Sequence, residues 1–165
     1  MRKFVSTVVA PGGLGKSSLI AAEALAMVTG KRLFDVWTWP RCRVWLWNLE
    51  DDEMSMARTI QAACKVHGIS EEDIGGRLYV NSGRDTPLCT AKVKSGEITI
   101  LEPVYAEILA QLKARKIDVL IIDPFVSSHA VTENDNMAID AVVKAWARVA
   151  DEANCAILLV HHTRK

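Results

Sequence analysis

Short apolar runs and longer helix-forming stretches alternate along the chain. The apolar runs predict strands at Phe4–Val9, Arg43–Leu49, Arg77–Asn81, Asp118–Ile122 and Cys155–Val160. The stretches between them predict helices at Ser17–Gly30, Asp51–His67, Val104–Lys116 and Asn136–Ala153. A weaker pattern predicts a hairpin over Leu88–Leu101 that turns at Ser95-Gly96. Strands that alternate with helices indicate an α/β fold, in which helices cover a mainly parallel sheet.

The turn between the first predicted strand and the first predicted helix has the pattern of a phosphate-binding loop. That motif has glycine, four residues, glycine, lysine, and serine or threonine. This chain reads APGGLGKS from Ala10 to Ser17, with alanine in place of the first glycine. The residues predicted to bind a nucleotide are Gly12, Gly13, Leu14, Gly15, Lys16, Ser17 and Ser18. The alternative interpretation is an ordinary glycine-rich turn between a strand and a helix.

Each part of this loop has a chemical role if a nucleotide binds. The glycines let backbone N–H groups turn toward phosphate oxygens, and the start of the helix favours anions. Lys16 can reach the terminal phosphates, and the hydroxyl of Ser17 can bind Mg²⁺. The methyl group of Ala10 costs little if the backbone there is not at positive φ.

The ends of other predicted strands also carry polar groups. The run IDVLIID delivers the carboxylate of Asp123 to the carboxyl edge of the sheet, where it can hold Mg²⁺. Alternatively, Asp123 caps a helix before Pro124. Glu50 ends the run WLWNLE and can act as a general base toward water. It is equally well interpreted as one of four solvated acids, Glu50–Glu53.

Two adjacent histidines follow the last predicted strand. His161 or His162 can donate a hydrogen bond to a γ-phosphate, and the sequence leaves open which of the two faces the nucleotide. The alternative is that both are ordinary surface or core residues. Ligands of parallel α/β sheets bind at the carboxyl ends of the strands, which favours the functional interpretation.

Composition narrows the class of protein further. The chain of 165 residues is half hydrophobic and fits a single domain over residues 1–165. Its net charge of zero gives no general electrostatic reason to bind nucleic acid. The scattered cysteines predict reduced, partly buried thiols of a cytoplasmic protein; they are Cys42, Cys64, Cys89 and Cys155. We expect no membrane contact, because no segment is long and apolar enough to span a bilayer.

Four segments occur in an order that resembles a known family. They are APGGLGKSSL, WNLEDD, IDPFVSSHAVTENDNMAID and LLVHHTRK. Together they resemble the RecA-like P-loop ATPases of the plasmid RepA helicase type, over nearly the whole chain. The resemblance implies a three-layer αβα fold with strand order 5-1-4-3-2. In that order the histidine strand lies between the loop strand and the Asp123 strand, with the Glu50 strand beyond.

The same resemblance implies roles for individual residues. It makes Lys16, Glu50 and His162 catalytic, with Glu50 as the catalytic glutamate and His162 as the γ-phosphate sensor. It makes Ser17 and Asp123 the ligands of Mg²⁺, and ATP the nucleotide. It implies single-stranded DNA as a further partner and a homo-oligomeric ring, a hexamer, for the full-length protein.

The resemblance also indicates what is missing. In such ATPases, the segment after HHTRK supplies further strands, DNA-facing loops and an arginine finger for the neighbouring subunit. The chain ends at Lys165, so we expect a domain truncated at its C-terminus that is slow alone. Neither Arg41 nor Arg43 matches the finger.

We therefore expect an ATPase that acts as a ring helicase or another DNA-associated motor. Two alternatives stay open. One is a nucleotide-dependent regulatory or scaffolding module that does not translocate on DNA. The other is a small-molecule P-loop kinase, which the lack of an arginine-rich lid disfavours. Trp37 and Trp39 are predicted to lie in a loop, where packing is preferred over base stacking as their role.

Overall fold

The computed structural model describes residues 1–11, 13, 15–35 and 40–163. Among the predicted functional residues, Gly12 and Leu14 lie outside this part of the chain. The loop tryptophans Trp37 and Trp39 also lie outside it.

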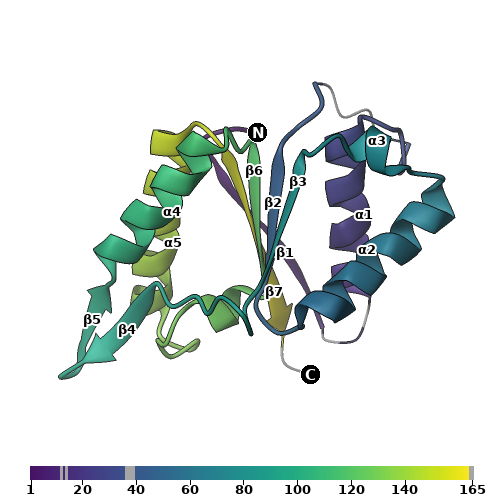
Figure 1. Ribbon diagram of the computed structural model, residues 1–165. Coiled ribbons are helices and arrows are strands. Elements are labelled where there is room, and N and C mark those ends of the chain that lie inside the picture. Colours follow the sequence, from purple (N-terminus) through teal and green to yellow (C-terminus); the bar gives the residue numbers. More distant parts are fainter. Residues whose placement is uncertain (12, 14, 36–39, 164–165) are drawn as a thin grey trace.

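A five-stranded parallel sheet forms the centre of the fold (Figure 1). Its strands, in spatial order, are β1 (Val5–Pro11), β7 (Ala156–Thr163), β6 (Val119–Asp123), β2 (Val44–Asn48) and β3 (Leu78–Ser82). The histidine strand β7 therefore lies between the loop strand β1 and the Asp123 strand β6, with β2 beyond, as predicted. Because all neighbouring pairs are parallel, the carboxyl ends of the strands meet at one edge of the sheet.

Helices cover both faces of this sheet, which gives the predicted three-layer αβα architecture (Figure 1). One face carries α1 (Lys16–Thr29), α2 (Glu53–His67) and α3 (Glu71–Ile74). The other face carries α4 (Glu102–Ala114) and α5 (Asn136–Ala153). We call these the α1 face and the α5 face.

The alternation of side chains along each strand divides the core between the two faces. In β2, Val44 and Leu46 pack in the core of the α1 face, and Trp45 and Trp47 pack in the core of the α5 face. The two indole rings stack at a centroid distance of 5.2 Å. Both strand tryptophans therefore belong to the core.

The hairpin predicted over residues 88–101 is present as β4 (Ala91–Lys94) and β5 (Glu97–Ile100). Ser95 and Gly96 both have positive φ, as a tight two-residue hairpin turn requires. Among the residues that the structure describes, this hairpin pairs with itself and has one further bridge, between Lys92 and Ala130.

Most helix boundaries follow their capping residues. α2 begins after Asp52, whose carboxylate accepts the N–H of Ser55, rather than at Asp51 as predicted. α4 begins at Glu102, before the predicted start, because Pro103 is compatible with the first turn of a helix. The short α3 and the 3₁₀ turn Phe125–Ser128 were too brief for periodicity to reveal.

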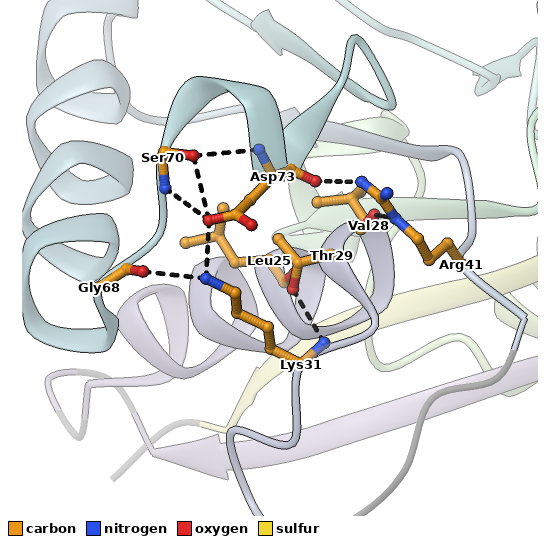
Figure 2. Close-up of polar contacts among 8 residues, drawn as sticks. All are labelled: Leu25, Val28, Thr29, Lys31, Arg41, Gly68, Ser70 and Asp73. Carbon is orange, nitrogen blue, oxygen red and sulfur yellow. Dashed lines mark hydrogen bonds and ion pairs between the residues drawn. The ribbon is translucent and has the colours of Figure 1, made fainter.

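A polar network fixes the far end of α1 (Figure 2). The ammonium group of Lys31 donates to the Gly68 carbonyl at 2.9 Å and to the Asp73 carboxylate at 2.7 Å. Arg41 donates to the carbonyls of Val28 and Asp73. The network therefore ties α1 to α3, and it occupies Arg41 in a structural role.

All four cysteines carry free thiols. Cys42 and Cys64 are half-buried and Cys155 is buried, but Cys89 is exposed. The expectation of partly buried thiols is thus wrong for Cys89, which lies in the segment that leads into the hairpin.

Candidate functional site

The carboxyl edge of the sheet gathers polar side chains on the α1 face. Residues two apart on a strand point to the same side. Asn48 therefore follows Leu46, Asp123 follows Ile121, and His162 follows Val160, all on the face that packs against α1 and α2. In the sheet, Asn48 lies directly opposite Asp123. The sequence analysis had marked Asp123 and His162 separately, and the parallel order brings them together with Asn48.

Ala10 fits the loop without strain. It lies within β1, paired in register with His162, and its φ is not positive. The first glycine of the motif is therefore not required for backbone conformation at this position. The expectation that the Ala10 methyl group costs little is confirmed.

Two other glycines of the loop do need their freedom. Gly13 has φ 80° and Gly15 has φ 77°, a region that L side chains rarely adopt. Gly15 immediately precedes the first residue of α1, so the N–H groups at the start of this helix lie next to the loop. Such a helix start carries a partial positive charge that attracts anions.

Lys16 closes the loop on itself. Its ammonium group donates to the carbonyls of Ala10 at 2.7 Å and Pro11 at 2.6 Å, and the residue is 7% exposed. Ser18, two residues further along α1, is exposed. A buried cation over a glycine-rich turn is the charge that an incoming phosphate oxygen needs.

Ser17 and Asp123 meet across the site. The Ser17 hydroxyl donates to Asp123 Oδ2 at 2.9 Å, which links the start of α1 to the end of β6. Asp123 is 2% exposed, and burial raises its pKa above the usual carboxyl value. The Ser17 hydrogen bond and His162 offset part of this rise in the pKa of Asp123, and the Asp51 charge adds to it. The alternative of an Asp123 helix cap is not supported, because the following 3₁₀ turn has Pro124 as its cap residue.

The structure separates the two histidines. His162 Nε2 lies 3.5 Å from Asp123 Oδ1, on the α1 face. His161 points to the α5 face, where it lines a cavity of about 240 Å³ with Phe125 and His129. Of the pair, His162 is therefore the one beside the candidate phosphate loop. The sensor role that the resemblance implies for it stays a prediction.

The chain turns sharply after β2, and this turn decides where Glu50 goes. The N–H groups of Glu50 and Asp51 both donate to Asn48 Oδ1, at 2.9 and 2.8 Å. The strand therefore ends at Asn48, and the side chain of Glu50 is exposed. Asp51, rather than Glu50, lines a small cavity with Ser17 and Asp123.

Asn48 and Asp51 are residues that the sequence analysis did not single out. A signal for Asn48 was present, because it is the one polar residue in the apolar run VWLWNL. Nothing local marked Asp51 apart from its neighbours, since three other acids flank it. The role of Glu50 as a base stays a prediction.

Two arginines of the sequence analysis lie away from this edge. Arg43 precedes β2 at the opposite, amino end of the strand, and its guanidinium donates to the Tyr79 hydroxyl at 3.2 Å. Arg41 lies in the network of Figure 2. Both arginines therefore serve the structure of this end of the sheet.

The residues at the edge fit a hard divalent cation bound together with phosphates. Asp123 Oδ1 is buried without a hydrogen-bond partner, which is costly for a carboxylate unless a cation compensates it. Among the described residues, no group of three or more His, Cys, Asp or Glu side chains can hold a metal ion. Mg²⁺ does not need such a group, because it is held by one or two carboxylates plus the phosphates of a ligand.

Comparison with known proteins identifies the family of the chain. A family model described as an AAA domain matches residues 1–165. No curated protein matches the chain. The match indicates a nucleotide-dependent P-loop ATPase, in agreement with the α/β fold and the loop. In the part of the chain that the structure covers, no helix is long and apolar enough to span a membrane.

Proposed function

The chain belongs to the AAA domain family, and from this premise we propose that it binds ATP with Mg²⁺ and hydrolyses it. The observation that carries the proposal is the hydrogen bond between Ser17 and the buried Asp123. It joins the phosphate-loop helix to the acidic strand end, beside a buried carboxylate oxygen that has no hydrogen-bond partner. A glycine-rich turn with a purely structural role has no need of such an oxygen.

The residues of the edge divide the work of binding between them. The N–H groups around Gly13 and Gly15 and the start of α1 hold the phosphates. Lys16 exchanges its loop carbonyls for terminal phosphate oxygens. Ser17 and Asp123 would hold Mg²⁺, which would neutralise the charge that develops on the transferred phosphoryl group.

Two further residues act on the reaction itself. His162 lies next to Asp123 and donates a hydrogen bond to the γ-phosphate. When hydrolysis removes the γ-phosphate, this hydrogen bond is lost, and β7 carries the change. Glu50 takes a proton from the attacking water as a general base. Because its carboxylate is exposed in the structure, this role requires the side chain to turn toward the edge when nucleotide is bound.

Substitution of Lys16 tests the binding step. We expect Lys16→Ala to weaken ATP·Mg²⁺ binding by about 1.5–3 kcal/mol, because it removes a charged hydrogen-bond donor from the phosphates. Calorimetric titration measures the change. Lys65→Ala removes an exposed lysine of α2 instead and serves as the control. Equal nucleotide affinity for wild type and Lys16→Ala would contradict ATP binding at this loop.

We further propose that the full-length protein is a motor on single-stranded DNA of the RepA type, assembled as a hexameric ring. The support is the resemblance of the four ordered segments. In such rings, a positive charge from the next subunit stabilises the transition state.

Light scattering and phosphate release test this finer proposal. We expect the full-length protein to assemble and its ATPase activity to rise when single-stranded DNA is added. Undiminished turnover by a monomer at high dilution would contradict the ring. Assembly with an ATPase that is indifferent to DNA would favour a regulatory module, and transfer of phosphate to a small molecule would indicate a kinase.

A further inference from the structure

We propose that Asp51, oriented by Asn48, is a second acid of the Mg²⁺ site and holds a water molecule of the ion's hydration shell beside Asp123. The inference rests on the proposed function, because it concerns the same edge of the sheet. The side chains of Asp51 and Glu50 are both exposed, but Asp51 lines this cavity and Glu50 does not, so the inference differs from the role predicted for Glu50.

The amide of Asn48 has only one possible orientation. Its Oδ1 accepts two backbone N–H groups, from Glu50 and Asp51, so the NH₂ group must point the other way. That group donates to Asp51 Oδ2 at 3.1 Å. Asn48 is 6% exposed, and its backbone is held between β6 and β3. The Asp51 carboxylate is therefore anchored to the rigid end of a central strand.

The neighbouring strand holds the same turn from a second side. The Ser82 hydroxyl donates to the Asp51 carbonyl at 2.9 Å, and the Gly83 N–H donates to the Asn48 carbonyl at 2.6 Å. A Cβ atom on Gly83 would lie 2.5 Å from Leu49 Cα, so the two chain segments are in close contact. These contacts hold the backbone of Asp51 in place, which an ordinary solvated acid at a helix start does not need.

The Asp51 side chain shares a cavity with the candidate Mg²⁺ ligands. The cavity has a volume of about 20 Å³ and is lined by the polar residues Ser17, Asn48, Asp51 and Asp123 above an apolar floor. This volume is enough for one water molecule, and the polar groups supply the partners that a bound water needs. Leu46 and Met56 of the floor are both buried.

Asp123 gives the independent reason to expect a ligand here. It is 2% exposed, and its Oδ1 has no hydrogen-bond partner, with His162 Nε2 the neighbouring group at 3.5 Å. Two charged carboxylates that line one cavity repel each other, and a cation between them offsets that repulsion. Mg²⁺ keeps several of its waters when it binds to proteins, and outer carboxylates commonly hold those waters.

A Mg²⁺ titration of the ATP complex tests the inference without measuring turnover. Binding of a fluorescent ATP analogue is followed at increasing Mg²⁺ concentration. We expect Asp51→Asn to raise the Mg²⁺ concentration at half-saturation about tenfold or more, the usual effect of removing a group that holds a metal's outer shell. Asparagine keeps an oxygen to accept from Asn48, so the fold should survive.

Two matched variants sharpen the result. Asp52→Asn should leave the Mg²⁺ midpoint unchanged, because Asp52 caps α2 and asparagine caps a helix equally well. Asn48→Ala, checked by thermal unfolding, should shift the midpoint in the same direction as Asp51→Asn. The double variant should shift it no further than one single variant, because both act through the same carboxylate.

The outcomes separate this inference from the proposed function. If the wild type binds the analogue with a Mg²⁺ dependence that Asp51→Asn leaves unchanged, the inference is wrong and the proposed function stands. If the wild type fails to bind the analogue at any Mg²⁺ concentration, the proposed function fails and takes the inference with it.

Discussion

Glu50 and Asp51 are neighbours in the sequence, but the turn at Asn48 separates their surroundings. Asp51 lines the polar cavity at the edge of the sheet, and Glu50 extends into solvent with its carbonyl bound by the Arg84 guanidinium at 3.0 Å. At the scale of single residues, adjacent acids can thus serve different steps. The proposed roles are the ion for Asp51 and the attacking water for Glu50.

Substitution of Glu50 tests whether it is a base. Glu50→Gln keeps the size and hydrogen bonding of the side chain but loses its basicity. General-base assistance is worth about 10²–10⁴-fold in rate, so we expect turnover in an active assembly to fall at least about a hundredfold. ATP affinity should stay near normal, because it depends on the loop, Lys16 and Mg²⁺.

The control for this substitution is Asp52→Asn, which should change neither turnover nor affinity. Steady-state phosphate release and calorimetry measure the two quantities. If Glu50→Gln hydrolyses ATP within a few-fold of the wild-type rate, then Glu50 is a solvated acid and another group must be the base.

At the scale of elements, the junction of α1 and α3 depends on one carboxylate (Figure 2). Hydrogen bonds from Lys31 and from the Ser70 backbone lower the pKa of Asp73 from 3.8 to about 2. Ser70 and Asp73 also form a reciprocal cap of α3. The charged form of Asp73 therefore stabilises the contact between these two helices.

This junction predicts a pH dependence of stability. Because the pKa of Asp73 is lower in the folded state, its stabilisation is fully present above about pH 4 and is lost as pH falls toward 2. We expect Asp73→Asn to lower the melting temperature at neutral pH and to flatten its fall between pH 4 and 2. Thermal unfolding at a series of pH values measures both effects.

The exposed Asp140 of α5 offers a control for Asp73. It pairs with Lys144 one helical turn away, and exposed pairs of this kind contribute little. Asp140→Asn should leave the melting temperature and its pH profile close to wild type. If both variants behave alike, the junction at Asp73 does not stabilise the fold as described.

At the scale of the whole molecule, the reactivity of the thiols measures whether the core on the α5 face is closed to solvent. Cys155 is buried in the core of the α5 face, and burial raises its pKa to about 11. Cys89 is exposed. In native buffer we expect a thiol reagent to label Cys89 first and Cys155 only when the molecule unfolds, because the reactive thiolate must form and be reached.

Peptide mass spectrometry of the labelled protein measures this order. Cys89→Ser should abolish the fast reaction, and denaturant should make Cys155 react at the rate of a free thiol. Labelling of Cys155 as fast as that of Cys89 in native buffer would mean that the sheet and α5 do not form one cooperative core.

Much of the fold and of the phosphate loop could be predicted from the sequence, because the responsible interactions are local. Alternating apolar runs mark the strands, Gly30 and Gly68 end their helices, and Ser95-Gly96 turns the hairpin. The loop residues Gly13 to Ser17 are contiguous, so their pattern needs no tertiary contact to be seen. The order of β1, β7, β6 and β2 came from the resemblance rather than from any local signal, and the place of β3 beyond β2 was not part of it.

Only the tertiary structure decided how the strand ends combine. Ser17 and Asp123 are 106 positions apart and meet because the parallel sheet brings α1 next to β6. His162 rather than His161 reaches this site because the side-chain alternation of β7 is fixed by which residues are buried on each face. Asn48 ends β2 by accepting two backbone N–H groups, and as a result Asp51, not Glu50, lines the cavity beside Ser17 and Asp123. These outcomes depend on burial across the entire sheet, which no short stretch of sequence contains.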